Sequence, residues 1–261
     1  MTEETRVRTV KSVENAFEIL EYLRDVNEAT VSEVAEYSTL SPGSVHTHLT
    51  TLKQRGYVVQ DGDEYRLGPL LLPLGEHVRN KSRIYRAAEE EVDRLAEETG
   101  ECAHLVVEHD GRLVTLYETF GENAVGTEYH TRKREEPISH HHCTAVGKAI
   151  LSQLDEERVE AIVDRHGMVQ RTPQTMTTRE ELFEDLERVR EQGYSVNDEE
   201  QMVGIRAVGA PVTTSGGDVL GAISVSGPTS RLNADEAETD LAESVIRASN
   251  IAEVNVHTIT E

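Results

Sequence analysis

The segment 41–68, SPGSVHTHLTTLKQRGYVVQDGDEYRLG, carries the strongest fold signal in the N-terminal third of the chain. Ser41 is a favourable helix N-cap, Pro42 suits the first helical position, and Gly56 is a helix stop. After this glycine the pattern changes to two short runs, YVVQ and EYRLG, separated by the turn-like tripeptide DGD. The sequence therefore predicts a helix followed by a β-hairpin.

Two shorter helical patterns precede this segment. Residues 12–26 place apolar side chains at helical spacing behind Ser12, the expected N-cap; these are Val13, Ala16, Phe17, Ile19, Leu20 and Leu23. A second short helix is predicted to follow Thr30, with Glu33 in its first turn. Two helices, a turn, a third helix and a hairpin in this order are typical of a winged helix-turn-helix, whose third helix enters the major groove of DNA.

The third predicted helix lies in a stretch without negative charge. The chain has 49 acidic and 26 basic residues, yet residues 37–60 contain no Asp or Glu. A helix that inserts between two phosphate strands cannot carry carboxylates on its leading face without strong repulsion, whereas hydroxyl, imidazole and cationic groups can donate to phosphates and base edges. We therefore expect the groove to be contacted by Ser44, Thr47, His48 and Arg55, and a phosphate by Lys53.

The charge of the whole N-terminal segment does not match this local pattern. Residues 1–70 contain seven Lys or Arg against twelve Asp or Glu, so the basic surface that usually marks a DNA-binding domain is absent. An interaction adaptor that docks another protein through the same helix face therefore remains an alternative to a protein that binds double-stranded promoter DNA.

The composition favours a cytoplasmic protein without a membrane segment. No run approaches the roughly 20 apolar residues of a membrane span, and the first residues contain no apolar signal-peptide core. Cys102 and Cys143 are too few for a disulfide framework, so we expect two reduced thiols. The net charge of −23 is spread over helix-like segments, which fits either a surface adapted to very high salt, as in a halophilic organism, or an ordinary acidic protein.

Helices and strands alternate in the C-terminal two thirds. Short β-branched runs predict strands at 103–109, 112–120, 194–198, 205–214 and 219–227. Acid-rich periodic runs predict helices at 86–100, 155–167, 178–193 and 233–257. A mainly antiparallel sheet with flanking helices, together with the winged helix, places the chain in the α+β class.

The predicted division is a winged helix-turn-helix at 10–70, a connector at 71–84 and a larger C-terminal domain at 85–257. The start of the connector is more apolar than a solvated linker requires, because it follows Leu70 with Leu71, Leu72 and Leu74. This favours contact with a second copy of the chain. A dimer would also match the two-fold symmetry with which helix-turn-helix proteins read palindromic sites.

Several motifs in this order resemble the IclR family of transcription regulators. They are HCTAVGKAILSQL from residue 142, RTPQTMTTREEL from 171, GYSVNDEEQMVGIRAVGAPV from 193 and AISVSGPTSRL from 222; with the winged helix, the likeness covers residues 10–254. The spacing of the family signature is matched by Gly193, Glu200, Ala207, Val208, Gly209 and Val212. The family pattern prefers Asp or Ser where this chain has Asn197, so the chain departs from it there.

The resemblance implies a GAF-like effector-binding domain and assembly into a homodimer or a dimer of dimers (a homotetramer). It also implies promoter binding that is switched by a small metabolite, often an organic acid such as an intermediate of sugar-acid or aromatic-acid breakdown. Carried over position by position, the family's pocket falls on Ala145, Val146, Asn197, Ala207, Ser224 and Ser226.

The residues themselves offer physical support for an anion at this place. Thr144 is close to the cap of a predicted helix, and the free N–H groups and dipole at a helix start favour a carboxylate. Ser224 and Ser226 are two apart, so their hydroxyls face the same side of a strand. Ordinary polar-face serines and an ordinary helix start explain the same pattern, and this alternative stays open.

Four side chains that can bind metals are consecutive at residues 140–143, HHHC, and His104 and His130 lie elsewhere in the chain. They raise the alternative of a metal-responsive regulator, although at most two of the four, such as His140 and His142, could converge on one ion. Known ligand spacings are absent, so we expect polar loop histidines and no metal or cofactor. No GxSxG, P-loop or GxGxxG pattern is present, so we do not expect an enzyme.

Overall fold

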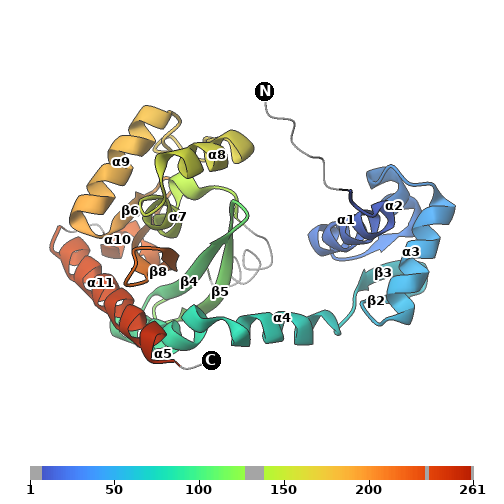
Figure 1. Ribbon diagram of the computed structural model, residues 1–261, viewed down its shortest axis with the longest axis horizontal. Coiled ribbons are helices and arrows are strands. Elements are labelled where there is room, and N and C mark those ends of the chain that lie inside the picture. Colours follow the sequence, from blue (N-terminus) through green and yellow to red (C-terminus); the bar gives the residue numbers. More distant parts are fainter. Residues whose placement is uncertain (1–7, 127–137, 233–234, 260–261) are drawn as a thin grey trace. The chain divides into compact units, whose positions relative to one another are not determined.

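The computed structural model describes residues 8–126, 138–232 and 235–259, without the side chains of residues 235–238. The chain forms two compact units, Met1–Val78 and Arg79–Glu261 (Figure 1). Both units combine helices with antiparallel strands, and the first is a winged helix-turn-helix, so the predicted α+β class is confirmed. Within the described residues, no helix has both the length and the apolar character needed to cross a bilayer.

In the described residues, the first unit consists of three helices and a three-stranded sheet. Its elements are α1 (Lys11–Val26), β1 (Ala29–Thr30), α2 (Val31–Tyr37), α3 (Pro42–Gln54), β2 (Val58–Asp61) and β3 (Glu64–Leu67). The strands form an antiparallel sheet in the order β1-β3-β2. Apolar residues from all three helices and the sheet pack in one core: Ile19, Leu23, Ala29, Val34, Val45, Leu49, Val58 and Tyr65.

Local capping explains where α2 and α3 begin. Thr30 and Glu33 form a reciprocal capping box, in which Thr30 Oγ1 accepts from the Glu33 N–H and Glu33 Oε2 accepts from the Thr30 N–H. At the start of α3, Ser41 Oγ accepts from the Ser44 N–H. Gly56 follows α3 with a φ of 76°, a left-handed conformation that glycine adopts without strain. The helix, stop and hairpin predicted within 41–68 are therefore confirmed.

Two details of α1 differ from the sequence-based expectation. The N-cap is Val10, which makes no side-chain cap hydrogen bond, and Ser12 lies inside the helix, so the prediction of Ser12 as the cap was wrong. Val13 and Phe17 are 51% and 61% exposed, because the stripe that reaches the core is narrower than the apolar pattern. The two-residue strand β1 has no sequence pattern of its own and exists through its pairing with β3.

The second unit contains five strands and most of the helices. The helix α4 (Leu71–Lys81) contains the boundary between the two units in the sequence and has no buried residue. The following helices are α5 (Arg83–Thr99), α7 (Ala145–Leu151), α8 (Glu156–His166), α9 (Arg179–Gln192), α10 (Thr229–Leu232) and α11 (Asp235–Thr258), with a 3-10 turn at His141–Cys143. The strands are β4 (Cys102–His109), β5 (Arg112–Phe120), β6 (Ser195–Asp198), β7 (Ile205–Thr213) and β8 (Val219–Pro228).

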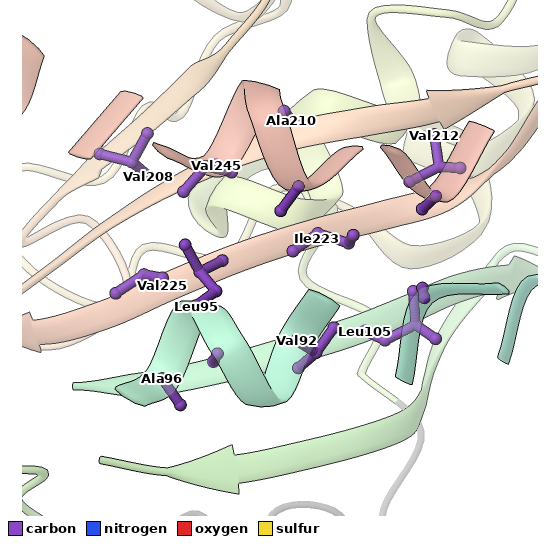
Figure 2. Close-up of a cluster of buried hydrophobic side chains, with 14 of the residues drawn as sticks. Val92, Leu95, Ala96, Leu105, Val208, Ala210, Val212, Ile223, Val225 and Val245 are labelled. Carbon is purple, nitrogen blue, oxygen red and sulfur yellow. The ribbon is translucent and has the colours of Figure 1, made fainter. Parts of the chain in front are cut away.

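These five strands form one antiparallel sheet in the order β5-β4-β8-β7-β6. The sequence predicts the antiparallel sheet but not the strand order. One face packs against α5 and α11, and Figure 2 shows Val92 and Leu95 of α5 beside Ile223 and Val225 of β8. Alternate strand residues point to the other face. There α7 covers the sheet, and Val106 of β4 belongs to a separate apolar cluster with residues of α7.

Candidate functional site

A line of polar side chains crosses the sheet face that α7 covers. In the strand register, His104 of β4 lies opposite Glu118 of β5 and opposite Ser224 of β8. The next row runs across four strands through Cys102, Ser226, Ala207 and Asn197, in that order. Because residues two apart on a strand share a face, strand pairing brings positions that are distant in the sequence to one place.

Several of these side chains line a cavity of about 300 Å³. All six residues that the resemblance assigns to the effector pocket lie in its wall: Ala145, Val146, Asn197, Ala207, Ser224 and Ser226. This volume is at the lower end of the range for small-molecule sites, so the cavity suits a small metabolite rather than a large cofactor. Contact between these residues and a ligand stays a prediction.

The wall also contains residues that the resemblance did not assign to the pocket. The strands β4 and β5 contribute His104, Thr115 and Glu118, and the loop after β6 contributes Gln201 and Met202. One signal for His104 was present in the sequence, since a polar residue interrupts the apolar run AHLVV. The register that aligns it with Glu118 and the β8 serines depends on strand order, which a single sequence does not supply.

The start of α7 is held close to the sheet at the edge of the cavity. Its N-cap, Thr144, accepts a hydrogen bond from the Gly147 N–H through Oγ1 at 3.1 Å. Ser195 Oγ donates to the Ala145 carbonyl at 2.6 Å. A Cβ on Gly209 would lie 3.0 Å from the backbone carbon of Ala145, so the glycine permits the close approach of helix to strand.

His104 has a partner on each side of its ring. Its Nδ1 is 3.0 Å from Glu118 Oε1, and its Nε2 is 3.0 Å from Ser226 Oγ. Burial by itself lowers the pKa of His104, but the charges and hydrogen bonds of Cys102 and Glu118 outweigh burial and raise this pKa above its usual value. The histidine is therefore held in a fixed orientation at the cavity wall.

Asn197 contributes a donor rather than an acceptor to the cavity wall. Its Oδ1 accepts hydrogen bonds from the backbone N–H groups of Glu200 at 2.9 Å and Gln201 at 3.3 Å. Because the carbonyl oxygen is committed to this loop, the amide adds an NH₂ donor. An Asp at the same position could accept the same two bonds, but it would add a negative charge.

A buried ion cluster ties the same loop to α7 and α9. Lys148 of α7 is 1% exposed, and its Nζ lies 2.6 Å from Glu200 Oε1 and 3.0 Å from Asp185 Oδ2. Burial raises the pKa of Glu200, and the charge and hydrogen bond of Lys148 oppose the rise. The signature residue Glu200 therefore has a structural partner that spacing alone does not reveal, because lysine is usually exposed.

The side chains at residues 140–143 have separate partners. Those partners are, in chain order, Arg171 Nη1 (3.0 Å), the Ser139 carbonyl (3.3 Å), the Val169 carbonyl (3.2 Å) and the His140 carbonyl (3.7 Å). In the described part of the chain, neither these histidines nor Cys143 belong to a group of three potential metal ligands. The metal alternative at this place gains no support, and His130 lies outside the described residues.

In the first unit, α3 and its C-cap carry the five residues expected to contact DNA. Thr47, Lys53 and Arg55 are exposed, whereas Ser44 and His48 are half-buried. The half-buried pair is joined through His48 Nδ1, which lies 2.8 Å from the Ser44 carbonyl and must donate to it. The contact fixes the orientation of the His48 ring on α3.

A hydrogen bond also ties α3 to the hairpin. Lys53 Nζ donates to Gln60 Oε1 of β2 at 2.7 Å, and Gln60 Nε2 donates to the Gly62 carbonyl at 2.9 Å. The predicted phosphate contact of Lys53 would therefore be made from a side chain that the hairpin already orients.

Known protein families match both units. The model of the IclR helix-turn-helix domain matches residues 12–62, and the model described as the bacterial transcriptional regulator IclR C-terminal domain matches residues 76–252.

Individual proteins are similar over nearly the full length. The chain is 40% identical over 252 residues to the probable HTH-type transcriptional regulator ArcR of Halobacterium salinarum, covering 96% of this chain and 95% of that protein. It is 32% identical over 232 residues to the HTH-type transcriptional regulator XynR of Escherichia coli, covering 88% and 90%. In fold, it is similar to an IclR homologue from Microbacterium hydrocarbonoxydans complexed with 4-hydroxybenzoate: the TM-score is 0.80 at 19% identity, over 95% of this chain and 100% of that chain.

Proposed function

The chain belongs to the IclR family of transcription regulators, and from this membership we propose that it binds promoter DNA as a homo-oligomer under the control of a small organic acid. In this proposal α3 lies in the major groove, and the effector occupies the cavity beside α7. The protein acts in the cytoplasm, where promoter DNA lies, by binding rather than by catalysis.

The observation that carries the effector proposal is the convergence of the six assigned residues on one cavity. The hydroxyls of Ser224 and Ser226, the NH₂ of Asn197 and the first N–H groups of α7 supply donors around it. In the described part of the wall, Glu118 is the one carboxylate, and His104 lies against it. A wall rich in donors and poor in unpaired negative charge favours a carboxylate ligand.

A cavity of about 300 Å³ favours a compact acid. We therefore choose two groups of probes, sugar acids and small aromatic acids, and 4-hydroxybenzoate is among them because the solved homologue is complexed with it. Each probe is added to the full chain, and the melting temperature is measured. A ligand that binds the folded state but not the unfolded state raises the melting temperature, and the rise grows with the logarithm of the ligand concentration once this exceeds the Kd.

Asn197→Asp tests the sign of the charge that the cavity accepts. The variant keeps an acceptor for the Glu200 and Gln201 N–H groups, but it places a carboxylate beside the ligand. We expect at least a roughly tenfold loss of affinity for an acid that shifts the wild-type melting temperature. Equal affinity in both proteins would contradict the proposed contact.

The DNA-binding proposal is supported by the surface of α3. The helix contains no acidic residue, and Thr47, Lys53 and Arg55 are exposed along it and at its end. Its capped start and its contact with the hairpin hold it as a rigid element. Such an element can enter a groove between phosphates without charge repulsion.

Exposed apolar residues support an assembly of at least two copies. On α1 and just before it, Val10, Val13 and Phe17 are 51% to 62% exposed. Before and within α4, the exposed apolar residues are Leu70, Leu72, Leu74 and Val78. Surfaces of this kind are unfavourable in water and are typically covered in an oligomer. Light scattering of the purified chain would distinguish a monomer from a dimer or a tetramer.

Electrophoretic mobility shifts with the gene's own upstream region test DNA binding. We expect the DNA affinity of the triple variant Thr47→Ala, His48→Ala, Arg55→Ala to be at least about a hundredfold lower than that of wild type, because each base contact contributes about 1–3 kcal/mol. Arg247→Ala is the control, since it removes an exposed cation from the second unit. Adaptation to high salt stays a prediction, so each assay is run at low and at molar potassium chloride.

If the chain were an interaction adaptor that does not bind DNA, the mobility-shift experiment would have a different outcome. It would show no preference for the upstream region over random DNA at any salt concentration. The triple variant would then have no effect on DNA affinity, and the surface of α3 would have to be assigned to a protein partner.

A further inference from the structure

Three side chains, two of which line the cavity, form a group that effector binding alone does not explain. Cys102, His104 and Glu118 each offer one ligand atom, and these atoms all lie within 4.8 Å of one another. Cys102 and His104 are two apart on β4, and Glu118 lies opposite His104 on β5. Paired strands, rather than a loop, therefore position all three, and rigid elements of this kind make well-defined binding sites.

The group is buried, and its carboxylate and imidazole are already in contact, because Glu118 Oε1 lies 3.0 Å from His104 Nδ1. Cys102 is 1% and Glu118 8% exposed, and the side chain of His104 is 13% exposed. A cation bound at these three atoms would replace the contact between histidine and carboxylate by metal–ligand bonds and would release the protons of its ligands. A divalent cation bound to one thiolate, one carboxylate and one neutral imidazole gives a site without net charge.

The ligand types select the metal. Sulfur, nitrogen and carboxylate oxygen together suit Zn²⁺, which binds Cys, His and Asp or Glu in tetrahedral sites. The surroundings of His104 also fit, because a metal-bound histidine usually donates its other ring N–H to a neighbour that fixes its orientation. Ser226 Oγ lies 3.0 Å from His104 Nε2 and occupies this supporting position, while Nδ1 faces Glu118.

Three protein ligands leave one tetrahedral position open. Zinc sites of this kind hold water or a bound small molecule at the fourth position, whereas purely structural zinc sites are closed by four protein ligands. His104 and Glu118 both line the cavity, so the open position faces the space in which the effector is proposed to lie.

We propose that Cys102, His104 and Glu118 bind one Zn²⁺ in the cavity wall, with its fourth position open to the cavity. This site is distinct from residues 140–143, whose side chains have other partners. Metal binding requires only the second unit and is independent of DNA. The further step, in which a carboxylate oxygen of the effector takes the open position, rests on the proposed function.

The test uses the untagged full chain, stripped with a chelator and then titrated with Zn²⁺ or Co²⁺. We expect about one equivalent of metal per chain by elemental analysis. Co²⁺ loading should give the charge-transfer band of a cobalt–thiolate bond and the intense visible bands of a tetrahedral centre. Cys102→Ser should abolish the charge-transfer band, and both Cys102→Ser and Glu118→Gln should weaken metal affinity at least about tenfold.

Cys143→Ser is the matched control. Cys143 is the second of the two cysteines in the chain and is also buried, and its Sγ lies 3.7 Å from the His140 carbonyl. This variant should keep the full metal content and the band. Circular dichroism of each stripped variant establishes that it is folded, and Glu118→Gln preserves side-chain volume should Cys102→Ser unfold.

Two results would overturn the metal site. One is a wild-type chain that retains no metal after loading, and the other is a cobalt spectrum that is unchanged by Cys102→Ser but lost in Cys143→Ser. Neither result affects the mobility-shift experiment, in which DNA binding is measured separately. A failed metal site and a failed regulator are therefore distinguishable.

Discussion

The two faces of the five-stranded sheet use the same strands for different purposes. Ile223 and Ser224 are neighbours on β8 and are 0% and 4% exposed, yet Ile223 belongs to the apolar core and Ser224 lines the cavity. Burial alone therefore does not identify core residues. On this sheet the chemistry of alternate residues separates a face that is filled by side chains from a face that leaves space for a ligand.

The helices that cover these faces are also held by different forces. On the filled face, α5 and α11 pack through apolar contacts such as those of Val92 and Val245 (Figure 2). On the cavity face, α7 is additionally anchored by the buried contacts of Lys148 with Glu200 and Asp185. Substitutions on the two sides should consequently change stability and ligand binding to different extents.

The largest effect is expected from Lys148→Met, which removes the cation and leaves two carboxylates without their shared partner. The free energy of unfolding should fall by about 3–5 kcal/mol, measured by urea denaturation. Adding Glu200→Gln to this variant should restore part of the loss, because one of the two negative charges is removed. A loss below about 1 kcal/mol would mean that the ion cluster does not anchor α7.

Ile223→Ala should lower the free energy of unfolding by about 2–5 kcal/mol, because it opens a cavity in the filled face. The affinity of the folded variant for an effector should be unchanged, since Ile223 does not line the ligand cavity. Calorimetric titration below the melting temperature checks the second part. A large change in affinity would show that the two faces of the sheet are coupled.

The free energy of unfolding should also depend on pH through His141, which lies in the 3-10 turn just before α7. Burial lowers the pKa of His141 to about 4, and this effect exceeds the opposing hydrogen bond to the Ser139 carbonyl. Between pH 6.5 and 4 the unfolded chain binds more protons at this residue than the folded chain, so stability falls as the pH falls through this window. At pH 5 the expected loss is about 2 kcal/mol.

The measurement is the free energy of unfolding as a function of pH for wild type and His141→Asn, whose amide can donate to Ser139 as the ring does. The variant should show a flatter pH dependence over this window. His257→Gln serves as the control, since it removes an exposed histidine instead of a buried one. Parallel curves for wild type and His141→Asn would contradict the assignment.

The smallest change in stability is expected for Ser224→Ala. Removing one hydroxyl from the cavity wall should change the free energy of unfolding by less than about 1 kcal/mol. The same variant should lose most of the rise in melting temperature that an acid effector produces in wild type. A rise as large as in wild type would show that this serine does not contact the ligand. The two variants would then differ only in their effect on stability, and the cavity face would have no demonstrated role in ligand binding.

The sequence predicts best those features that depend on neighbouring residues. Ser41, Pro42 and Gly56 locate α3 correctly, because capping and helix termination act over a few positions. The strands are also recognised from their composition, and their sheet is antiparallel as expected. Val10 replaces Ser12 as the cap of α1, which shows that a favourable cap residue does not by itself set a helix boundary.

Features that require long-range pairing could not be derived in the same way. The position of His104 beside Ser224 follows from the adjacency of β4 and β8, which no local pattern encodes. The six pocket positions came from the family resemblance. His104 was recognised from the sequence only as a side chain that can bind metals, and its place beside Glu118 follows from the pairing of β4 with β5. The burial of Lys148 is similar, because its partners Glu200 and Asp185 are supplied by a loop and by α9.

The hydrogen bond between Lys53 and Gln60 has a consequence for attempts to reprogram the operator preference of this protein. An exchange of α3 for a helix without lysine at position 53 would remove this side-chain contact, although Val58 and Tyr65 would still pack the hairpin against the core. A graft that keeps the contact would carry position 60 together with position 53. The helix and the hairpin would then be varied together, because a library that randomises α3 alone would contain many variants without the contact between positions 53 and 60.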